Sequence, residues 1–154
     1  MFSKEERKEK NTTFWNAFKA ISKKHQSREG RRINWVNYPT HVKPLYIRLH
    51  ADQNTARFSI EIQDKDEGIR NLICEQFTEL KKVLEAEMPR KGNWIENAEN
   101  SAHQEIGRIY WEINGVNMYT LKDHKKIFNF LMEHLLGFDR FYAVYKEIVI
   151  GLIR

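Results

Sequence analysis

The chain has 154 residues but contains only one cysteine, three prolines and seven glycines. A single cysteine cannot form an internal disulfide, which excludes a small disulfide-stapled scaffold. The few glycines form no Gly-rich phosphate loop, which argues against a nucleotide-hydrolysing core. The longest apolar runs, such as residues 148–153, are far shorter than the roughly 20 residues that cross a bilayer. Residues 1–5 carry no apolar signal region, so we expect a cytoplasmic protein without a membrane span.

Patterns that hold metals or perform catalysis are also missing. The six histidines show no paired metal-ligand spacing, and Cys74 has no histidine near it in the chain. We therefore expect no cofactor, no bound metal and no catalytic centre built on these residues.

Charge is distributed unevenly along the chain. Residues 1–50 contain twelve Lys and Arg against four Asp and Glu, whereas residues 51–154 contain fourteen against seventeen. The formal charge of +5 therefore combines a first third at +8 with a remainder at −3. Within the basic third, cations and aromatic residues occur together in the short stretch 31–38, a composition that suits an anionic partner bearing rings.

The composition predicts one globular domain over residues 1–154, because 41% of the residues are apolar and 31% are charged. The run from Lys4 to Lys10 has no apolar face, and residues 1–10 are expected to fray. Ser3 and Glu6 match a capping box that starts a helix ending near Lys24. Three further helices are predicted. The first covers 66–88 and is capped by Asp64 and Glu67, the second runs from Thr120 to a break at Gly137, and the third begins at about Asp139.

Strands are predicted where apolar and polar residues alternate. Residues 45–50 and 56–63 form a hairpin, residues 94–96 and 108–113 form a second pair, and Asn114-Gly115 turns the chain into residues 116–119. Residues 35–38 form an edge or bulged strand, since Pro39 and Pro44 flank it. The predicted fold is therefore α+β, with a twisted, mainly antiparallel sheet of about five to six short strands. The 66–88 and C-terminal helices pack on one face.

Several segments, taken in order, resemble a known family. They are residues 30–38 (GRRINWVNY), 56–66 (ARFSIEIQDKD), 77–85 (FTELKKVLE), a strand at Trp94, and residues 108–110 (RIY). From roughly Asn11 to its C-terminus, the chain resembles the bacterial family called domain of unknown function 4268. The resemblance implies a domain found alone or at the C-terminal end of longer bacterial proteins, some with nuclease-like domains, and hence a nucleic-acid or defence context. It brings no assigned activity and no catalytic residues.

The function we expect is non-catalytic binding of DNA, RNA or another polyanion through the basic first third. The candidate contacts combine cations with rings that can stack: Arg28, Arg31, Arg32, Trp35, Tyr38, Lys43, Tyr46, Arg48 and Arg57. The alternative is that Glu61 and nearby carboxylates neutralise these arginines and that Trp35 is buried. The hairpin register bears on this choice. Paired residue numbers summing to 105 place Arg48 opposite Arg57, whereas 107 places Arg48 opposite Ser59, and the sequence leaves both open.

A metal-dependent nuclease is a second hypothesis. Asp52, Glu61 and Gln63 distantly resemble an acidic residue followed by Glu-x-Lys, and paired carboxylates can hold a divalent cation that activates water. However, glutamine stands where lysine is expected, and Asp52 lies in a turn, where aspartate is common because it caps backbone amides.

A third hypothesis is a protein-interaction module that self-associates through the last helix. Its apolar stripe is wider than one contact surface needs, which suggests a homodimer seam. The seam would comprise Phe141, Val144, Tyr145, Ile148, Val149, Ile150 and Ile153. The alternative is that the last helix packs against Phe14 and Phe18 of the first helix.

Overall fold

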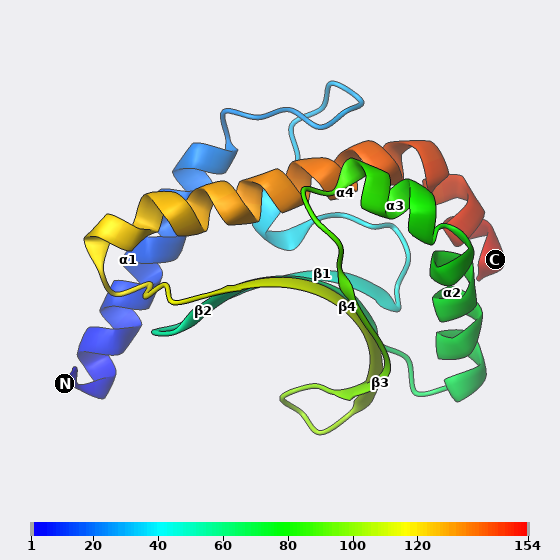
Figure 1. Cartoon of the computed structure of the whole chain (residues 1–154), viewed down its shortest axis with the longest axis horizontal. Coiled ribbons are helices and arrows are strands. Elements are labelled where there is room, and N and C mark those ends of the chain that lie inside the picture. Colours follow the sequence, from blue (N-terminus) through cyan, green and yellow to red (C-terminus); the bar gives the residue numbers. More distant parts are fainter. Residues whose placement is uncertain (1, 154) are drawn as a thin grey trace.

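The computed structural model describes residues 2–153, apart from the side chains of residues 95 and 96. One open antiparallel sheet with strand order β1-β2-β4-β3 lies beneath the long helix α4 (Figure 1). The predicted α+β class and antiparallel sheet are confirmed. Along the chain the elements are α1 (Lys4–Ser22), the 3₁₀ turn η1 (Trp35–Asn37), β1 (Leu45–Ala51), β2 (Thr55–Ile62), α2 (Glu67–Glu79), α3 (Lys81–Glu87), β3 (Asn93–Glu99), β4 (Glu105–Asn114), η2 (Leu121–Asp123) and α4 (His124–Leu152).

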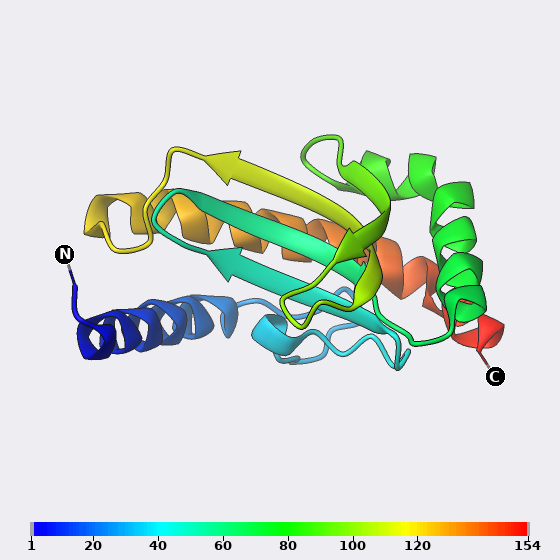
Figure 2. The ribbon, with the colours of Figure 1, turned by 90° about the horizontal axis from the view of Figure 1, so that it is seen from below.

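The sheet has one buried face and one open face. Phe58, Ile60 and Ile62 alternate along β2, and each is at most 1% exposed because this face packs beneath α4. Figure 2 views the sheet from the other side, which none of the described helices covers. Leu45 pairs with Ile62, so residue numbers sum to 107 and Arg48 lies opposite Ser59. This register settles the choice that the sequence left open.

Helix α4 is continuous over 29 residues, which corrects the predicted break at Gly137. The glycine allows a close approach between helices. A Cβ atom at Gly137 would lie 2.7 Å from the carbonyl oxygen of Glu87 and 3.0 Å from the sulfur of Met88, at the end of α3. Gly137 therefore marks the place where α3 crosses α4. Within the described chain, neither α4 nor any shorter helix combines the length and hydropathy that a bilayer crossing requires.

The single helix predicted over 66–88 is two helices joined at Leu80. Leu80 leaves regular helical geometry, with φ −92° and ψ 7°, and α3 turns away from α2. The bend lets both helices bury a face, because Phe77 before it and Leu84 after it are fully buried. The helix cap is Asp66 rather than Asp64, since its carboxylate accepts the backbone N–H groups of Gly68 and Ile69.

Residues 35–37 form the 3₁₀ turn η1, not the predicted strand. The side-chain oxygen of Asn34 accepts the backbone N–H of Asn37 and closes the turn. The turn directs the Trp35 ring into the core, where the indole N–H donates to the carbonyl of His25 at 3.1 Å. The aromatic residues that suggested a strand therefore serve packing.

Residues 116–119 are likewise not a strand. The backbone N–H groups of Gly115 and Val116 donate to the carbonyl of Asn54, and that of Met118 donates to the carbonyl of Asp52. These bonds attach the segment to the β1–β2 turn. The side chains of Val116 and Met118 are both buried, which accounts for the alternation that predicted a strand.

Helix α1 begins with the predicted capping box, in which Ser3 and Glu6 exchange side-chain to backbone hydrogen bonds of 3.1 and 3.3 Å. Residues 4–10, expected to fray, are helical and exposed. Phe14 and Phe18 contact Phe128, near the start of α4. The first helix thus packs on the N-terminal part of α4, not on the C-terminal part that the sequence suggested.

Candidate functional site

The predicted contact residues fall on two sides of the molecule. Residues 23–34 form a loop that lies beyond α4 as seen from the sheet, whereas β1 and β2 lie on the other side of that helix (Figure 1). Arg28, Arg31 and Arg32 belong to the loop, while Arg48 and Arg57 belong to the sheet. The structure therefore does not assemble the nine predicted residues into one patch.

Two of the three rings predicted to stack on a ligand, Trp35 and Tyr38, are core residues. Trp35 is 1% exposed and Tyr38 is 9% exposed. The Tyr38 hydroxyl donates to a carboxylate oxygen of Asp139 at 2.6 Å. Burial and this negatively charged neighbour raise the pKa of Tyr38 well above its usual range. Neither ring offers a face to a base, in agreement with the alternative that Trp35 is buried.

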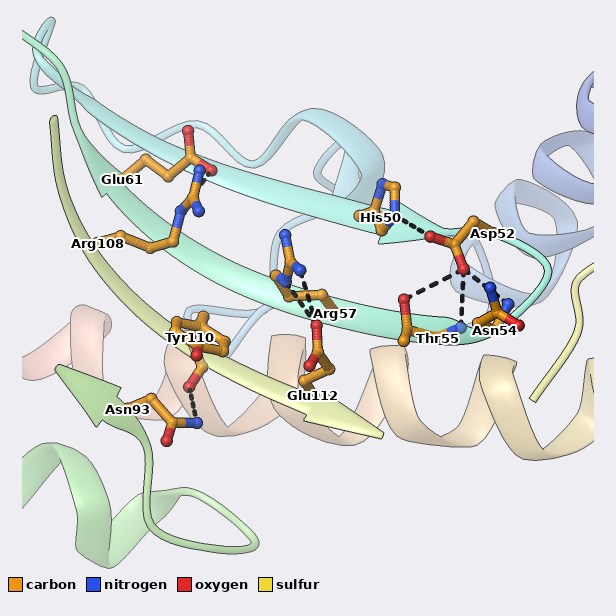
Figure 3. A network of polar contacts seen from close by, with 10 residues as sticks. All are labelled: His50, Asp52, Asn54, Thr55, Arg57, Glu61, Asn93, Arg108, Tyr110 and Glu112. Carbon is orange, nitrogen blue, oxygen red and sulfur yellow. Dashed lines mark hydrogen bonds and ion pairs between the residues drawn. The ribbon is translucent and has the colours of Figure 1, made fainter. Parts of the chain in front are cut away.

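Carboxylates neutralise two arginines on the open sheet face (Figure 3). The guanidinium of Arg57 forms an ion pair of 2.7 Å with Glu112 on β4. Glu61 lies 3.5 Å from Arg108 rather than beside the predicted arginines. Because Arg57 and Glu112 are direct partners across β2 and β4, the sheet register itself brings these charges together.

The tyrosines of this face are covered by arginines. The guanidinium of Arg48 lies 4.5 Å from the ring centre of Tyr46, and that of Arg57 lies 5.5 Å from the ring centre of Tyr110. Arg48 is exposed, and Tyr46 is half-buried. On the open face, arginines therefore stack on tyrosines or form ion pairs with carboxylates, and little excess charge remains.

The loop side retains its positive charge. We call residues 23–32 the basic loop; it contains five cations and one carboxylate, a formal charge of +4. The five cations are exposed, and within the described chain no carboxylate forms an ion pair with any of them: Lys23, Lys24, Arg28, Arg31 and Arg32. The carboxylate, Glu29, pairs with Lys146 of α4 at 2.5 Å, and this hydrogen bond lowers the pKa of Glu29.

Polar contacts hold the basic loop in one shape. The Ser27 N–H donates to the carbonyl of Arg31 and the Gly30 N–H to that of Ser27, both at 2.8 Å. Gly30 has φ +76°, a conformation that glycine adopts without strain. The second carboxylate oxygen of Asp139 accepts the backbone N–H of Arg28 at 2.5 Å. The tight turn and its anchors present the cations on a defined backbone.

Lys43 belongs to a surface groove rather than to the basic loop. It is exposed and lines a groove of about 870 Å³ together with Tyr46 and Gln63. The groove is lined by both cations and carboxylates: Lys65 and Arg70 on the one hand, and Asp64, Glu67 and Glu105 on the other. Arg70 is buried and donates to the backbone carbonyls of Asp64 and Lys65, so its charge stabilises that loop.

The candidate metal ligands are not brought together. Asp52 lies in the β1–β2 turn, whereas Glu61 pairs with Tyr46, six residues and about 20 Å away along the strands. Burial alone would raise the pKa of Asp52, but hydrogen bonds from Asn54, His50 and Thr55 lower it to about 2. Glu61 accepts a hydrogen bond from Gln63. Within the described residues, no group of three or more His, Cys, Asp or Glu side chains could hold a metal ion.

The predicted dimer seam is only partly on the surface. Phe141 and Val149 are buried, and Tyr145 and Ile150 pack against the core. The remaining members, Val144, Ile148 and Ile153, are 68%, 46% and 37% exposed. Much of the wide apolar stripe therefore packs within the domain.

Sequence reasoning missed Asp139, the carboxylate beneath the basic loop. It is 3% exposed and lies among Phe138, Phe141 and Tyr142 on α4. One signal in the sequence was available: a lone acidic residue within an aromatic stretch is expensive to bury unless hydrogen bonds satisfy it. Nothing in the chain indicated that its partners lie 101 and 111 residues away.

Comparison with known proteins gives a family but no characterised relative. Neither a curated protein nor a solved structure matches the chain. A family profile described as a domain of unknown function matches residues 11–146, from the middle of α1 to the last turns of α4. The match includes the basic loop, Asp139 and all four strands, and the chain therefore belongs to the DUF4268 family.

Proposed function

We propose that the chain binds nucleic acid through its phosphate backbone and that the basic loop is the contact surface. One observation carries the proposal: among the residues that the structure describes, five exposed cations on one short loop form no ion pair with a carboxylate, and that loop is fixed to α4. Duplex DNA carries one negative charge per roughly 1.7 Å of axis, so closely spaced cations displace several counterions together.

Duplexes are the preferred ligand in this proposal. Proteins that bind single strands without sequence preference usually stack bases on exposed aromatic rings. Trp35 and Tyr38, the two rings that follow the loop in sequence, are buried and cannot do so. Binding should therefore depend on phosphate density, which is higher in a duplex, and should show little sequence preference.

The test is a fluorescence-anisotropy titration of labelled duplex DNA, single-stranded DNA and RNA over a range of salt concentrations, with magnesium present. We expect the duplex to bind most tightly and its affinity to fall steeply with salt. Replacing Arg28, Arg31 and Arg32 with alanine should reduce the slope of log K against log salt by about 2.7 if each contacts one phosphate. Thermal stability should not change, because these side chains are exposed and form no ion pair with a carboxylate of residues 2–153.

A matched control removes the same charge elsewhere. Lys122, Lys125 and Lys126 are exposed near the start of α4, and their triple alanine variant should keep most of the affinity and the salt slope. Equal losses in both variants would reduce the effect to net charge. Absence of wild-type binding even at low salt would reject the proposal. Tighter binding of single strands than of duplexes would indicate a contact surface at Tyr46 and the sheet face instead. The appearance of cleavage products would favour the nuclease hypothesis.

Self-association through α4 is the second candidate. Val144 and Ile148 lie one turn apart on α4 and remain substantially exposed, although the rest of the stripe is largely covered. Because the two side chains are neighbours on one helix face, they form a contiguous apolar patch, and contiguous exposed apolar patches mark interaction sites more often than single exposed residues do.

A further inference from the structure

The basic loop has few apolar contacts to hold it in place. Of residues 23–32, only His25 and Ser27 are half-buried, and the rest are exposed. The loop arches over a small cavity of about 90 Å³ lined by Ser27, Tyr38, Asp139 and Lys146, among others. Its shape must therefore come from polar anchors rather than from burial of side chains.

Two of these anchors come from one face of α4. Asp139 accepts the backbone N–H of Arg28, and Lys146, two turns later, pairs with Glu29. The Asp139 carboxylate is the more unusual of the two because it is 3% exposed. A buried carboxylate is costly unless its oxygens are satisfied, and Tyr38 and Arg28 each satisfy one.

We propose that Asp139 is a positioning residue for nucleic-acid binding: it contacts no ligand, but it fixes the basic loop in the shape that places the arginines on phosphates. The inference rests on the proposed function of the loop. A loop that is already ordered loses less conformational entropy when it binds, so its affinity is higher than that of a mobile loop with the same charge.

Charge and positioning predict opposite results when Asp139 is replaced. Asp139→Ala removes a negative charge from beneath the loop, so electrostatics alone would tighten binding to a polyanion. Loss of the anchor would instead loosen residues 27–31 and weaken binding. Asp139→Asn carries the same charge change, yet its amide can still accept from Arg28 N–H and donate to the Tyr38 oxygen. The comparison of these two variants isolates the anchor.

We expect Asp139→Ala to bind duplex DNA about tenfold more weakly than Asp139→Asn, in the anisotropy titration at fixed salt. Hydrogen exchange should show faster exchange of the Arg28 amide in the alanine variant only. Equal affinity of the two variants would overturn the positioning role while leaving the proposed function intact. Failure of the wild-type chain to bind would overturn both.

A second pair of variants covers the case in which Asp139→Ala does not fold. Arg28→Ala and Arg28→Pro both remove the cation, but only proline also removes the N–H that Asp139 accepts. Because Arg28 lies on an exposed loop, both variants should keep the fold. Weaker binding by the proline variant than by the alanine variant is expected, and equal binding would contradict the inference.

Discussion

Replacing Gly137 with alanine should destabilise the domain, although alanine is the better helix former. The added Cβ would lie 2.7 Å from the carbonyl oxygen of Glu87, inside the normal contact distance. That carbonyl also accepts a hydrogen bond from Arg140 at 3.0 Å, so α3 cannot shift without straining this contact. Overpacking costs about 1–3 kcal/mol, and the gain in helix propensity is about 1 kcal/mol. Because the clash is with a backbone carbonyl, which cannot move away as a flexible side chain can, the overpacking cost falls in the upper part of this range, about 2–3 kcal/mol. The expected net loss in free energy of unfolding is therefore about 1–2 kcal/mol.

Urea denaturation followed by tryptophan fluorescence would measure this loss, with a corresponding decrease in Tm of roughly 2–8 °C. The matched control is Gly151→Ala in the same helix, where a Cβ meets no atom within 4 Å. It should leave stability unchanged or raise it by up to about 1 kcal/mol. If Gly137→Ala were as stable as the control, the close crossing of α3 and α4 would not require glycine and the reasoning would be refuted.

Two further predictions concern α4. His134 is fully buried, and burial lowers its pKa to about 4. The unfolded chain therefore binds more protons than the folded chain between about pH 4 and 6.5. The free energy of unfolding should fall by about 3 kcal/mol as the pH drops through this range. Urea midpoints of wild type and His134→Leu at pH 7 and 4.5 would check this, since the histidine-dependent part of the decrease should disappear in the variant. For self-association, Val144→Asp should convert an oligomer into a monomer on a sizing column without loss of stability, and an unchanged elution volume would remove this helix face from consideration.

The sheet and helices were predictable where the periodic pattern is strong. The strands over 45–51 and 55–62 alternate clearly, and the Ser3 capping box marks the start of α1. The pattern predicts less reliably where the same residue type can either end a helix or allow another helix to pack closely. Gly137 is typical of a helix end, yet it lies within a continuous helix because a second helix crosses there. That distinction depends on a neighbour that is 50 residues away in the chain, which no local pattern reveals.

The candidate site was predictable only in part. The excess of cations over residues 23–32 is visible in the sequence, but which cations lack carboxylate partners is not. Arg57 forms an ion pair with Glu112 because the register between β2 and β4 places the two residues opposite each other. Trp35 and Tyr38 lie close to Arg31 and Arg32 in the sequence, as ligand-binding rings would, yet both are buried where the chain folds into η1 and its cap. Asp139 illustrates the same limit, since its partners are distant in the chain.

Because α4 lies between the basic loop and the sheet, the molecule has two separate surfaces, a cationic one at the basic loop and a charge-balanced one at the open sheet face. A polyanion lying along residues 23–32 would leave the open face of β1, β2 and β4 uncovered, because the thickness of α4 and the sheet separates the two surfaces. The charge-balanced face remains accessible while the cationic side is occupied. If the basic loop binds nucleic acid as proposed, a second molecule can reach the open sheet face at the same time.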